Sequence, residues 1–593
     1  MRLIERVKAE YALLDGVVRT FIAYGRIGKE TPGTVGDDLE KSADKYAANE
    51  AFRCEGHSLS YAEFDALANR VAHWGRAQGL KRGEVVALFA FNSTEYLAVW
   101  MGLCKIGVVT ALINTNLTGA ALAHCINIAE AGHVIVDPEL DGAYQDAAPL
   151  LTGKPRAWNL DGDFAAALAT QSSVRIPREE ARGGMLGGAL CLLVYTSGTT
   201  GQPKAARMPH WRVQGMMRAF VGGVRAQQSD RNYVALPLYH STGGLCAIGV
   251  MLERGGCVII RRRFSATHFW RDVSAERATM FFYVGEMCRY LINQPEEPAE
   301  AHHCVRAIVG NGLRPDIWMK FKTRFRIPKI LEFYGSTEGN VNMLNFDGKP
   351  GAVGRVPPYL SFLINVRLVK FDVEAEAPVR GPDGFCIEAA EGEPGEALGE
   401  IRANNRRYLF EGYSGDPAQT SKKILRDAFA KGDAWFRTGD LMKRDKDCYF
   451  YFVDRIGDTF RWKGENVSTN QIAETLTAYP GVKEAIVYGV RIGALDGRAG
   501  MASLTTGPDF DLAGLRDNLH RELPAFARPM FIRLQQTIDT TGTFKYRKMD
   551  LVREGFDPEA TSDPLFFDDP DSGAFVAITP ALRDRLVSGA VKL

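Results

Sequence analysis

The 593-residue chain lacks several features that would assign it to a specialised class. Its formal net charge is only +1, so it has no strong positive field of the kind that nucleic-acid-binding proteins carry. No run of about 20 apolar residues is present, because even residues 85–117 are interrupted by Asn92, Glu95 and Lys105. We therefore expect neither nucleic-acid binding nor a transmembrane span.

Cysteine is sparse and scattered. Ten cysteines lie between Cys54 and Cys448, with no Cys-x-x-Cys pair and no Cys/His cluster at metal-ligand spacing. No secretory signal is recognised, and the charged, amphipathic start, residues 1–8, predicts a surface helix. These observations predict reduced, mostly buried cysteines and a cytoplasmic protein.

The N-terminal part alternates between apolar runs and helical patterns, which predicts an α/β fold with a parallel sheet. With 46% hydrophobic residues, the chain can form several domains around a large core. The expected order is a strand at 85–91, a helix started by Asn92 with Glu95 as its capping partner, a strand at 108–113, a helix at 118–130 and a strand at 133–137.

Composition and pattern predict a domain boundary near Asp454, giving a large domain of residues 1–453 and a smaller α+β domain of residues 454–593. Residues 374–400 are rich in Pro, Gly, Ala and Glu and predict a surface loop between small strands. About thirty C-terminal residues, rich in Asp, Pro and Phe, are expected to lie across the surface. The smaller domain is expected to contain a helix capped by Ser468, strands at 485–490, 500–506 and 531–535, and a helix that presents Leu512, Leu515, Leu519 and Leu523 on one face.

The stretch from Tyr195 to Lys204, Tyr-Thr-Ser-Gly-Thr-Thr-Gly-Gln-Pro-Lys, follows an apolar run typical of a buried strand. Glycines let backbone N–H groups approach a phosphate, while hydroxyl groups and a lysine add donors. Lys204 follows a proline, so the stretch is not a Walker A sequence. It predicts a phosphate-binding loop, with a polar surface turn as the alternative.

Further motifs follow in a fixed order. Tyr334-Gly-Ser-Thr-Glu338 combines an aromatic ring with a carboxylate. Asp440, in Thr-Gly-Asp-Leu, adds a second carboxylate directly after a glycine. A short Gly-Asn-Gly turn at 310–312 and Thr-Thr-Gly-Thr-Phe-Lys at 540–545 complete the set.

These motifs resemble, in sequence and order, those of the adenylate-forming (AMP-binding) superfamily. The resemblance implies that Lys545, Glu338 and Thr199 are catalytic, that Glu338 also holds Mg²⁺, and that Asp454 and Arg455 mark a hinge between the domains. It also implies that Tyr334 stacks on adenine, that Asp440 binds the ribose hydroxyls, and that Arg455 contacts the ribose or a phosphate. Lys548 is the alternative to Lys545, and Thr200 competes with Thr199 for the closer phosphate contact. The nucleotide-binding residues that the resemblance implies are Thr196, Ser197, Gly198, Thr199, Thr200, Gly201, Lys204, Gly310, Asn311, Gly312, Tyr334, Thr337, Asp440 and Arg455.

Other stretches resemble the fatty acid transport protein and very-long-chain acyl-CoA synthetase family, notably residues 236–244, 283–295 and 451–467. In that family the first two line the acyl site, which implies His240, Tyr283 and Gly285 as substrate residues. Gly464-Glu-Asn replaces the Gly-Tyr-Arg of many superfamily members, and Gly464 is the residue expected to line the coenzyme A channel. Animal members carry an N-terminal membrane segment that is not recognised here.

The resemblance implies an ATP- and Mg²⁺-dependent ligase that joins a long- or very-long-chain fatty acid to coenzyme A through an acyl-AMP intermediate. The alternatives are a ligase for a sterol side-chain or aromatic acid, transfer of the acyl group to a carrier protein, and a non-catalytic lipid-binding or transport partner. A homodimer and peripheral contact with the inner face of a membrane are left open. The basic triplet at 261–263 is interpreted as a solvated charge cluster rather than a site for lipid head groups or coenzyme A phosphates.

Overall fold

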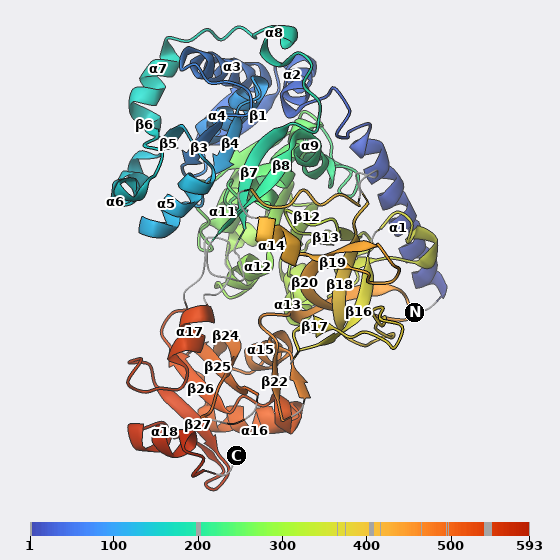
Figure 1. The fold of residues 1–593 in the computed structure, drawn as a ribbon, viewed down its shortest axis with the longest axis vertical. Coiled ribbons are helices and arrows are strands. Elements are labelled where there is room, and N and C mark those ends of the chain that lie inside the picture. Colours follow the sequence, from blue (N-terminus) through green and yellow to red (C-terminus); the bar gives the residue numbers. More distant parts are fainter. Residues whose placement is uncertain are drawn as a thin grey trace. The chain divides into compact units, whose positions relative to one another are not determined.

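A computed structural model describes residues 3–196, 203–364, 366–373, 375–402, 408–414, 417–463, 465–493, 495, 497–538 and 548–591. The chain forms two compact units (Figure 1). The large unit comprises Met1–Leu313, Met319–Arg355 and Ile401–Ile424, and the second unit comprises Arg314–Trp318, Val356–Glu400 and Leu425–Leu593. Within the described ranges, no helix combines the length and apolar character that a membrane crossing requires. The domain boundary and the hinge that the sequence places near Asp454 both stay predictions.

A six-stranded sheet in the large unit has the order β6-β5-β3-β4-β7-β8. All neighbours are parallel except the antiparallel β7–β8 pair, which confirms the predicted α/β class. Apolar side chains from β3, β4, β5 and helix α5 form its core. The strands are β3 (Val85–Phe89), β4 (Val109–Leu112), β5 (His133–Val136), β6 (Arg156–Asn159), β7 (Leu190–Thr196) and β8 (Lys204–Pro209).

The predicted start of the helix after β3 was wrong by one residue. Helix α4 (Thr94–Lys105) is capped by Ser93, whose hydroxyl accepts a hydrogen bond from the backbone N–H of Tyr96. Asn92 instead donates through Nδ2 to the carbonyl oxygens of Leu236 and Arg261, at 2.9 and 3.0 Å. The side chain of Asn92, which the local pattern assigned to the helix cap, therefore makes a tertiary contact instead.

An eight-stranded sheet, order β14-β13-β12-β11-β9-β10-β1-β2, forms the other half of the large unit. Its inner neighbours are parallel and its two edge pairs antiparallel. Parallel pairing puts the carboxyl ends of β11, β12 and β13 at one edge, where ligands bind in open α/β sheets. The strands are β1 (Glu50–Cys54), β2 (His57–Ser60), β9 (Arg231–Val234), β10 (Cys257–Ile260), β11 (Met280–Val284), β12 (Ala307–Asn311), β13 (Lys329–Tyr334) and β14 (Met343–Asn345), with the short β15 (Gly354–Arg355) in the same unit.

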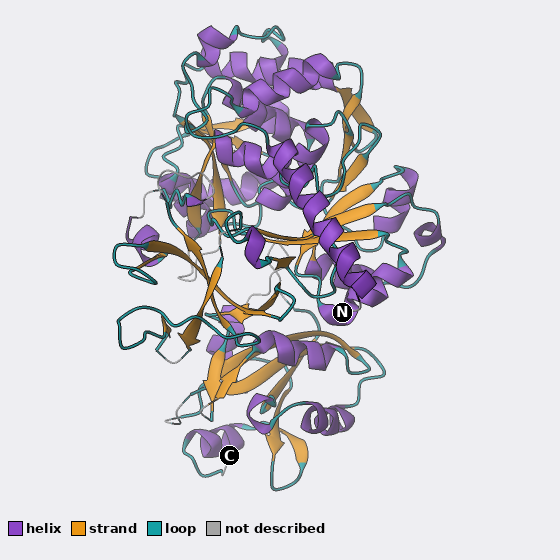
Figure 2. Cartoon of the chain, turned by 90° about the vertical axis from the view of Figure 1, so that its right-hand side faces the viewer, coloured by secondary structure: helices purple, strands orange, loops and turns teal. Residues whose placement is uncertain are grey.

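Helices cover these sheets (Figure 1). The N-terminal surface helix was predicted and is α1, which lies across the front of its unit in Figure 2. All ten cysteines are free thiols, and most are buried, as predicted. The helices are α1 (Leu3–Tyr24), α2 (Val35–Lys45), α3 (Tyr61–Ala77), α4 (Thr94–Lys105), α5 (Gly119–Ile128), α6 (Asp141–Ala147), α7 (Ala165–Ala169), α8 (Arg178–Arg182), α9 (His210–Arg218), α10 (Ile248–Leu252), α11 (Phe269–Ala275), α12 (Gly285–Ile292), α13 (Pro315–Arg324) and α14 (Pro417–Lys422).

The second unit contains an antiparallel sheet of order β17-β16-β18-β20-β21. The surface loop predicted at 374–400 was wrong at its end, because Gly395–Glu400 is the buried strand β18. Glu396 is fully buried there and pairs with Arg437 at 2.8 Å, which offsets the cost of burying a carboxylate. The other strands are β16 (Arg367–Asp372), β17 (Ala377–Pro378), β19 (Ile424–Arg426), β20 (Ala434–Arg444) and β21 (Tyr449–Arg455).

The rest of the second unit is the predicted α+β arrangement, with a core of its own. Ser468 caps α15 as expected, accepting from the backbone N–H of Gln471. The C-terminal extension was expected on the surface, but two of its strands join the sheet β24-β25-β26-β27-β28. The elements are the β22 (Phe460–Trp462) and β23 (Glu465–Val467) pair, α15 (Thr469–Thr477), β24 (Val482–Val490), β25 (Ala499–Thr506), α16 (Leu512–Glu522), β26 (Phe531–Gln535), α17 (Lys548–Glu554), β27 (Leu565–Asp569), β28 (Ala574–Ala577) and α18 (Pro580–Val587).

Candidate active site

The predicted phosphate-binding loop connects β7 to β8. Thr196 ends β7 and Lys204 begins β8, and the two residues are cross-strand partners. Several predicted site residues lie outside the described part of the chain, and their roles stay predictions. They are Ser197, Gly198, Thr199, Thr200, Gly201, Gly464 and Lys545.

Two glycine-containing turns meet at the carboxyl ends of β11 and β12. A Cβ on Gly285 would lie 1.7 Å from the carbonyl oxygen of Gly312, and a Cβ on Gly310 would lie 2.3 Å from that of Tyr283. Gly312 also has a φ of +79°, a conformation that favours glycine. The predicted Gly-Asn-Gly loop, which includes Asn311 at the end of β12, therefore packs directly against the predicted acyl-site segment.

A buried carboxylic acid that the sequence analysis did not identify joins these strands. Glu332 on β13 accepts a hydrogen bond from the backbone N–H of Leu313 at 3.0 Å, and its other oxygen is hydrogen-bonded to the hydroxyl of Tyr283. Both side chains are buried, and burial raises the pKa of Glu332 to about 8. The only sequence signal was a single acid within an apolar strand. Tyr283 thus supports the sheet edge from inside, and its acyl-site role stays a prediction.

The segment after β13 carries Thr337 and Glu338. Arg212 on α9 is buried and donates from Nε to the carbonyl oxygen of Thr337 at 2.8 Å, and from Nη2 to that of Gly339. The hydroxyl of Thr337 is hydrogen-bonded to that of Ser241 at 3.0 Å, next to the predicted substrate residue His240. Two elements distant in sequence therefore fix this segment just beyond the predicted adenine-stacking residue Tyr334.

Tyr413 orients the carboxylate of Glu338. Its hydroxyl donates to Oε1 of Glu338 at 2.8 Å, and burial together with Glu338 raises the pKa of Tyr413. Tyr413 forms a β-bridge with Ala206 on β8. Lys204 Nζ lies 5.5 Å from the centroid of the Tyr413 ring and donates to Gln419 at 2.9 Å. The structure thereby brings two predicted residues, Lys204 and Glu338, to one unpredicted tyrosine.

In the second unit, Asp440 and Arg455 are cross-strand partners on β20 and β21. Arg455 Nε lies 3.9 Å from Oδ1 of Asp440, and half of the Arg455 side chain is exposed. The backbone N–H of Asp440 donates to the hydroxyl of Thr438 at 3.1 Å. The predicted ribose residue Asp440 and Arg455, which the resemblance places at the ribose or a phosphate, thus form one adjacent pair.

The predicted hinge residue Asp454 is almost fully buried, and burial raises its pKa. Its Oδ2 accepts hydrogen bonds from the backbone N–H and the hydroxyl of Thr469, at 2.6 and 2.9 Å, at the start of α15. Lys548, the alternative to Lys545, donates to Asp458 at 3.1 Å and to the Thr469 hydroxyl at 3.3 Å. These contacts give Lys548 a structural role in the second unit.

The basic triplet is already paired with carboxylates. Arg261 Nε lies 3.0 Å from Asp272, and Arg262 Nη2 lies 2.9 Å from Asp137 and 2.7 Å from Glu139. The third arginine of the triplet also pairs with Glu139, at 2.8 Å. This pairing favours the charge-cluster interpretation over a site for anionic head groups.

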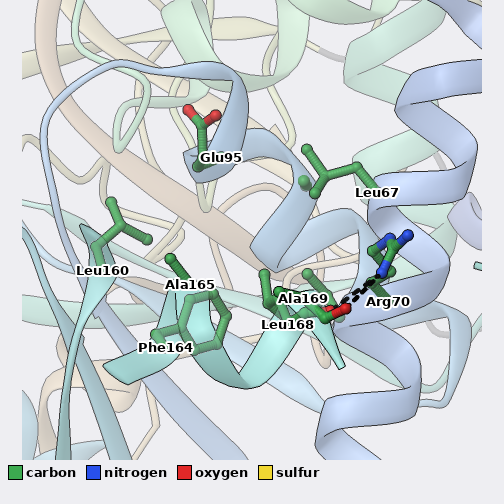
Figure 3. Close-up of a pocket in the computed structure, with 10 residues that line it drawn as sticks. Leu67, Arg70, Glu95, Leu160, Phe164, Ala165, Leu168 and Ala169 are labelled. Atoms are coloured by element: carbon green, nitrogen blue, oxygen red, sulfur yellow. Dashed lines mark hydrogen bonds between the residues drawn. The ribbon is translucent and has the colours of Figure 1, made fainter. Parts of the chain in front are cut away.

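A separate pocket of about 280 Å³ lies among α3, α4 and residues 160–169 (Figure 3). Its lining is mainly apolar, with Leu67, Leu160 and Phe164, and its charged residues are Arg70 and Glu95. Arg70 donates to the carbonyl oxygens at the end of α7, so its charge is used within the fold. The volume is below the roughly 300–1,000 Å³ typical of ligand pockets, and none of the predicted site residues lines it.

Comparison with known proteins agrees with the motifs. A model of the AMP-binding enzyme family matches residues 39–413, and a model of the AMP-binding enzyme C-terminal domain matches residues 471–545. Long-chain fatty acid transport protein 6 of Mus musculus is 40% identical over 550 residues, covering 91% of this chain and 88% of the relative. Long-chain fatty acid transport protein 2 of Rattus norvegicus is 38% identical over 548 residues, covering 90% and 88%.

The fold agrees as well. The crystal structure of ATP-bound MatB from Rhodopseudomonas palustris has 26% sequence identity and a TM-score of 0.73, over 88% of this chain and 99% of that one. The resemblance stated from the motifs is thereby confirmed. With both family models matched in order along the chain, and relatives near 40% identity over nine-tenths of it, the chain belongs to the AMP-binding enzyme family and, within it, to the long-chain fatty acid transport proteins.

Proposed function

We propose that this protein ligates a long- or very-long-chain fatty acid to coenzyme A, using ATP and releasing AMP and pyrophosphate. The observation that carries the proposal is the arrangement around Glu338, whose carboxylate is oriented by Tyr413 beside Lys204 at the edge where β12 and β13 end. The names of its relatives supply the substrate class, since both are long-chain fatty acid transport proteins.

In the first half-reaction, a carboxylate oxygen of the fatty acid attacks the α-phosphorus of ATP. A new acyl–phosphate bond forms, the bond between the α-phosphorus and its bridging oxygen breaks, and pyrophosphate leaves with that electron pair. We assign Tyr334 to the adenine face, Asp440 to the ribose, Arg455 to the ribose or a phosphate, and Lys545 to the negative charge that develops on the α-phosphate. The triphosphate contacts are assigned to Thr196, Ser197, Gly198, Thr199, Thr200, Gly201, Lys204 and Thr337.

The residues present fit a magnesium ion held mainly by the substrate. Within the described part of the chain, no group of three or more His, Cys, Asp or Glu side chains could hold a metal. Mg²⁺ commonly binds through one or two carboxylates plus substrate phosphates and water, so one oriented carboxylate is sufficient. We assign Oε2 of Glu338 to this ion, because Tyr413 engages Oε1. When bound, the ion would neutralise charge on the phosphates.

In the second half-reaction, the thiol sulfur of coenzyme A attacks the acyl carbonyl carbon of acyl-AMP. The thioester bond forms, the bond from the acyl carbon to the phosphate oxygen breaks, AMP leaves with that electron pair, and the thiol proton passes to solvent. The two halves require different groups at one position, which a rotation about the predicted hinge at Asp454 would supply. Gly464 is assigned to the coenzyme A channel, where the absence of a side chain allows close approach.

Turnover across a panel of acids tests the proposal. We expect CoA-dependent AMP formation with long-chain fatty acids, and its loss in Lys545→Ala. Activity restricted to sterol side-chain or aromatic acids would instead support the alternative ligase. Acyl-AMP formation without coenzyme A transfer would support delivery to a carrier protein. Failure of every acid to drive pyrophosphate release would support a non-catalytic lipid-binding role. The substrate assignments of His240, Tyr283 and Gly285 are tested by whether their substitution changes chain-length preference.

Replacing Tyr413 with phenylalanine should weaken magnesium use rather than abolish chemistry. The variant loses one hydrogen bond to a charged group, worth about 1.5–3 kcal/mol, so the Mg²⁺ concentration for half-maximal rate should rise about tenfold or more. The maximal rate at saturating Mg²⁺ should change much less. Tyr451→Phe is the matched control, because Tyr451 donates to Asp445 at 3.0 Å in the second unit. An unchanged magnesium dependence in Tyr413→Phe would contradict the assignment.

We also propose peripheral contact with the inner face of a membrane, in a cytoplasmic location, since the proposed substrate is a membrane-soluble lipid. Flotation of the purified protein with vesicles tests this. A homodimer is the other assembly that the sequence leaves open, and the exposed face of helix α1 in the large unit is relevant to it.

A further inference from the structure

Helix α1 exposes an unusual number of apolar side chains to solvent. Its outward side chains are between 38% and 73% exposed, whereas monomeric proteins seldom display contiguous apolar surface without a partner. The helix lies across the front of its unit in Figure 2, with nothing of that unit drawn over it. The exposed apolar residues are Ile4, Val7, Tyr11, Leu14, Val18, Phe21 and Ile22.

Six of these residues follow a strict alternating spacing. From Ile4 to Phe21 the intervals are three, four, three, four and three residues, which is the a/d pattern of a coiled-coil heptad. A surface helix that packs on a core or lies in a lipid surface has a wider apolar face. The spacing therefore favours a second helix as the occupant of this seam.

The opposite face of α1 is committed to its own unit. Ala9, Leu13 and Gly16 are buried, and a Cβ on Gly16 would lie 2.3 Å from the ring of Phe346. At the next turn, a Cβ on Gly222 would lie 2.4 Å from the backbone of Arg19. Gly16 of α1 and Gly222 of the segment beneath it allow this close contact in only one orientation. The helix therefore cannot rotate about its axis to bury its exposed apolar residues.

We propose that this seam pairs, antiparallel, with the same seam of a second copy of the chain. Antiparallel alignment sets Tyr11 against Leu14 of the other copy, and Val7 against Val18, with each layer occurring twice by symmetry. It also brings Lys8 near Asp15 of the other copy, but Arg19 and Arg225 of its own chain already hold that carboxylate at 2.7 and 2.9 Å, so the apolar layers carry the association. Parallel alignment would instead stack Tyr11 on Tyr11 and Leu14 on Leu14.

The charge of α1 favours a second copy of the chain over a lipid surface as the partner of this seam. The helix carries three acidic and three basic side chains, a balance that gives no attraction to anionic head groups. They are Glu5, Glu10, Asp15, Arg6, Lys8 and Arg19. Two such helices bury on the order of 1,000 Å², the lower limit for a specific interface, so the dimer should be weak and concentration-dependent. This inference does not depend on the ligase reaction.

Sedimentation velocity of the full chain, from about 1 to 100 µM, tests the proposal. We expect wild type to shift from monomer to dimer across this range, and Leu14→Glu to raise the dimer dissociation constant at least about tenfold. Leu14 is exposed, so its replacement should leave thermal stability unchanged. Arg6→Glu is the control, because Arg6 is exposed but lies outside the seam.

Mixing two variants tests the alignment. Tyr11→Lys and Leu14→Glu chains, each monomeric alone, should form a heterodimer, because the new charges face each other only in the antiparallel pair. Wild type that is monomeric throughout, or a dimer that Leu14→Glu leaves intact, would overturn the proposal. Monomeric wild type that sediments with phosphatidylcholine–phosphatidylglycerol vesicles, and loses this in Leu14→Glu, would assign the seam to a lipid surface instead.

Discussion

Replacing Glu338 with glutamine should reduce the rate of acyl-AMP formation by about 100- to 1,000-fold, the usual cost of removing one electrostatic contributor to a transition state. Glutamine keeps the shape and can still accept the hydrogen bond from Tyr413, so the loss isolates the charge. The measurement is fatty-acid-dependent exchange of pyrophosphate into ATP, which reports the first half-reaction without coenzyme A. Urea unfolding of the variant should match wild type.

Glu411→Gln is the matched control for this prediction. Glu411 lies two residues from Tyr413, but its partner is Lys29 at 2.9 Å, in an ion pair that is partly exposed. We expect its exchange rate to stay within about twofold of wild type, because exposed pairs contribute little. A Glu338→Gln enzyme that keeps most of its exchange activity would remove Glu338 from the metal site.

Replacing Glu332 with glutamine should make the protein less sensitive to rising pH. Burial raises the pKa of Glu332 to about 8 in the folded protein, well above its ordinary value of 4.5. Between these values the folded state binds more protons than the unfolded state, so stability falls as pH rises through this window. The glutamine variant has no proton to lose, so its advantage in free energy of unfolding should grow by a few kcal/mol from pH 5 to pH 8 and then level off.

Urea unfolding of both proteins from pH 5 to pH 9 measures this difference, since other titrating groups act equally in both. Glu391→Gln supplies the control, because Glu391 is exposed and its substitution should leave the pH dependence unchanged. A difference between Glu332→Gln and wild type that is constant over the range would mean that Glu332 keeps one protonation state throughout. The backbone N–H of Leu313 and the Tyr283 hydroxyl would then suffice to hold that state.

Local patterns were sufficient for much of the fold. The strands at 85–91 and 133–137 could be predicted because buried parallel strands are continuous apolar runs, which need no knowledge of distant residues. Strand β18 could not, because its buried Glu396 is tolerated only through Arg437, 41 positions away. Asn92 was assigned to a cap for the same reason, since its acceptors lie more than 140 residues further along the chain.

The candidate site divides in the same way. The motifs located the segments that carry Lys204, Glu338 and Asp440, because each motif is short and contiguous. They did not identify the residues that hold those segments, since Arg212 reaches Thr337 across 125 positions and Tyr413 reaches Glu338 across 75. A lone arginine or tyrosine carries no local signature of such a role.

The buried carboxylate of Asp454 has a mechanical consequence for any rotation of the C-terminal part. Asp454 binds the first turn of α15 through two hydrogen bonds to Thr469. These bonds join the end of β21 rigidly to α15, so the two elements would move together in such a rotation. A pivot placed between them would have to break both bonds and leave Oδ2 of this buried carboxylate without its Thr469 partners, although Oδ1 would keep the backbone N–H of Arg455. If the predicted rotation occurs, its rigid part would therefore include the end of β21, and its flexible joint would lie on the N-terminal side of Asp454 unless the bonds to Thr469 break.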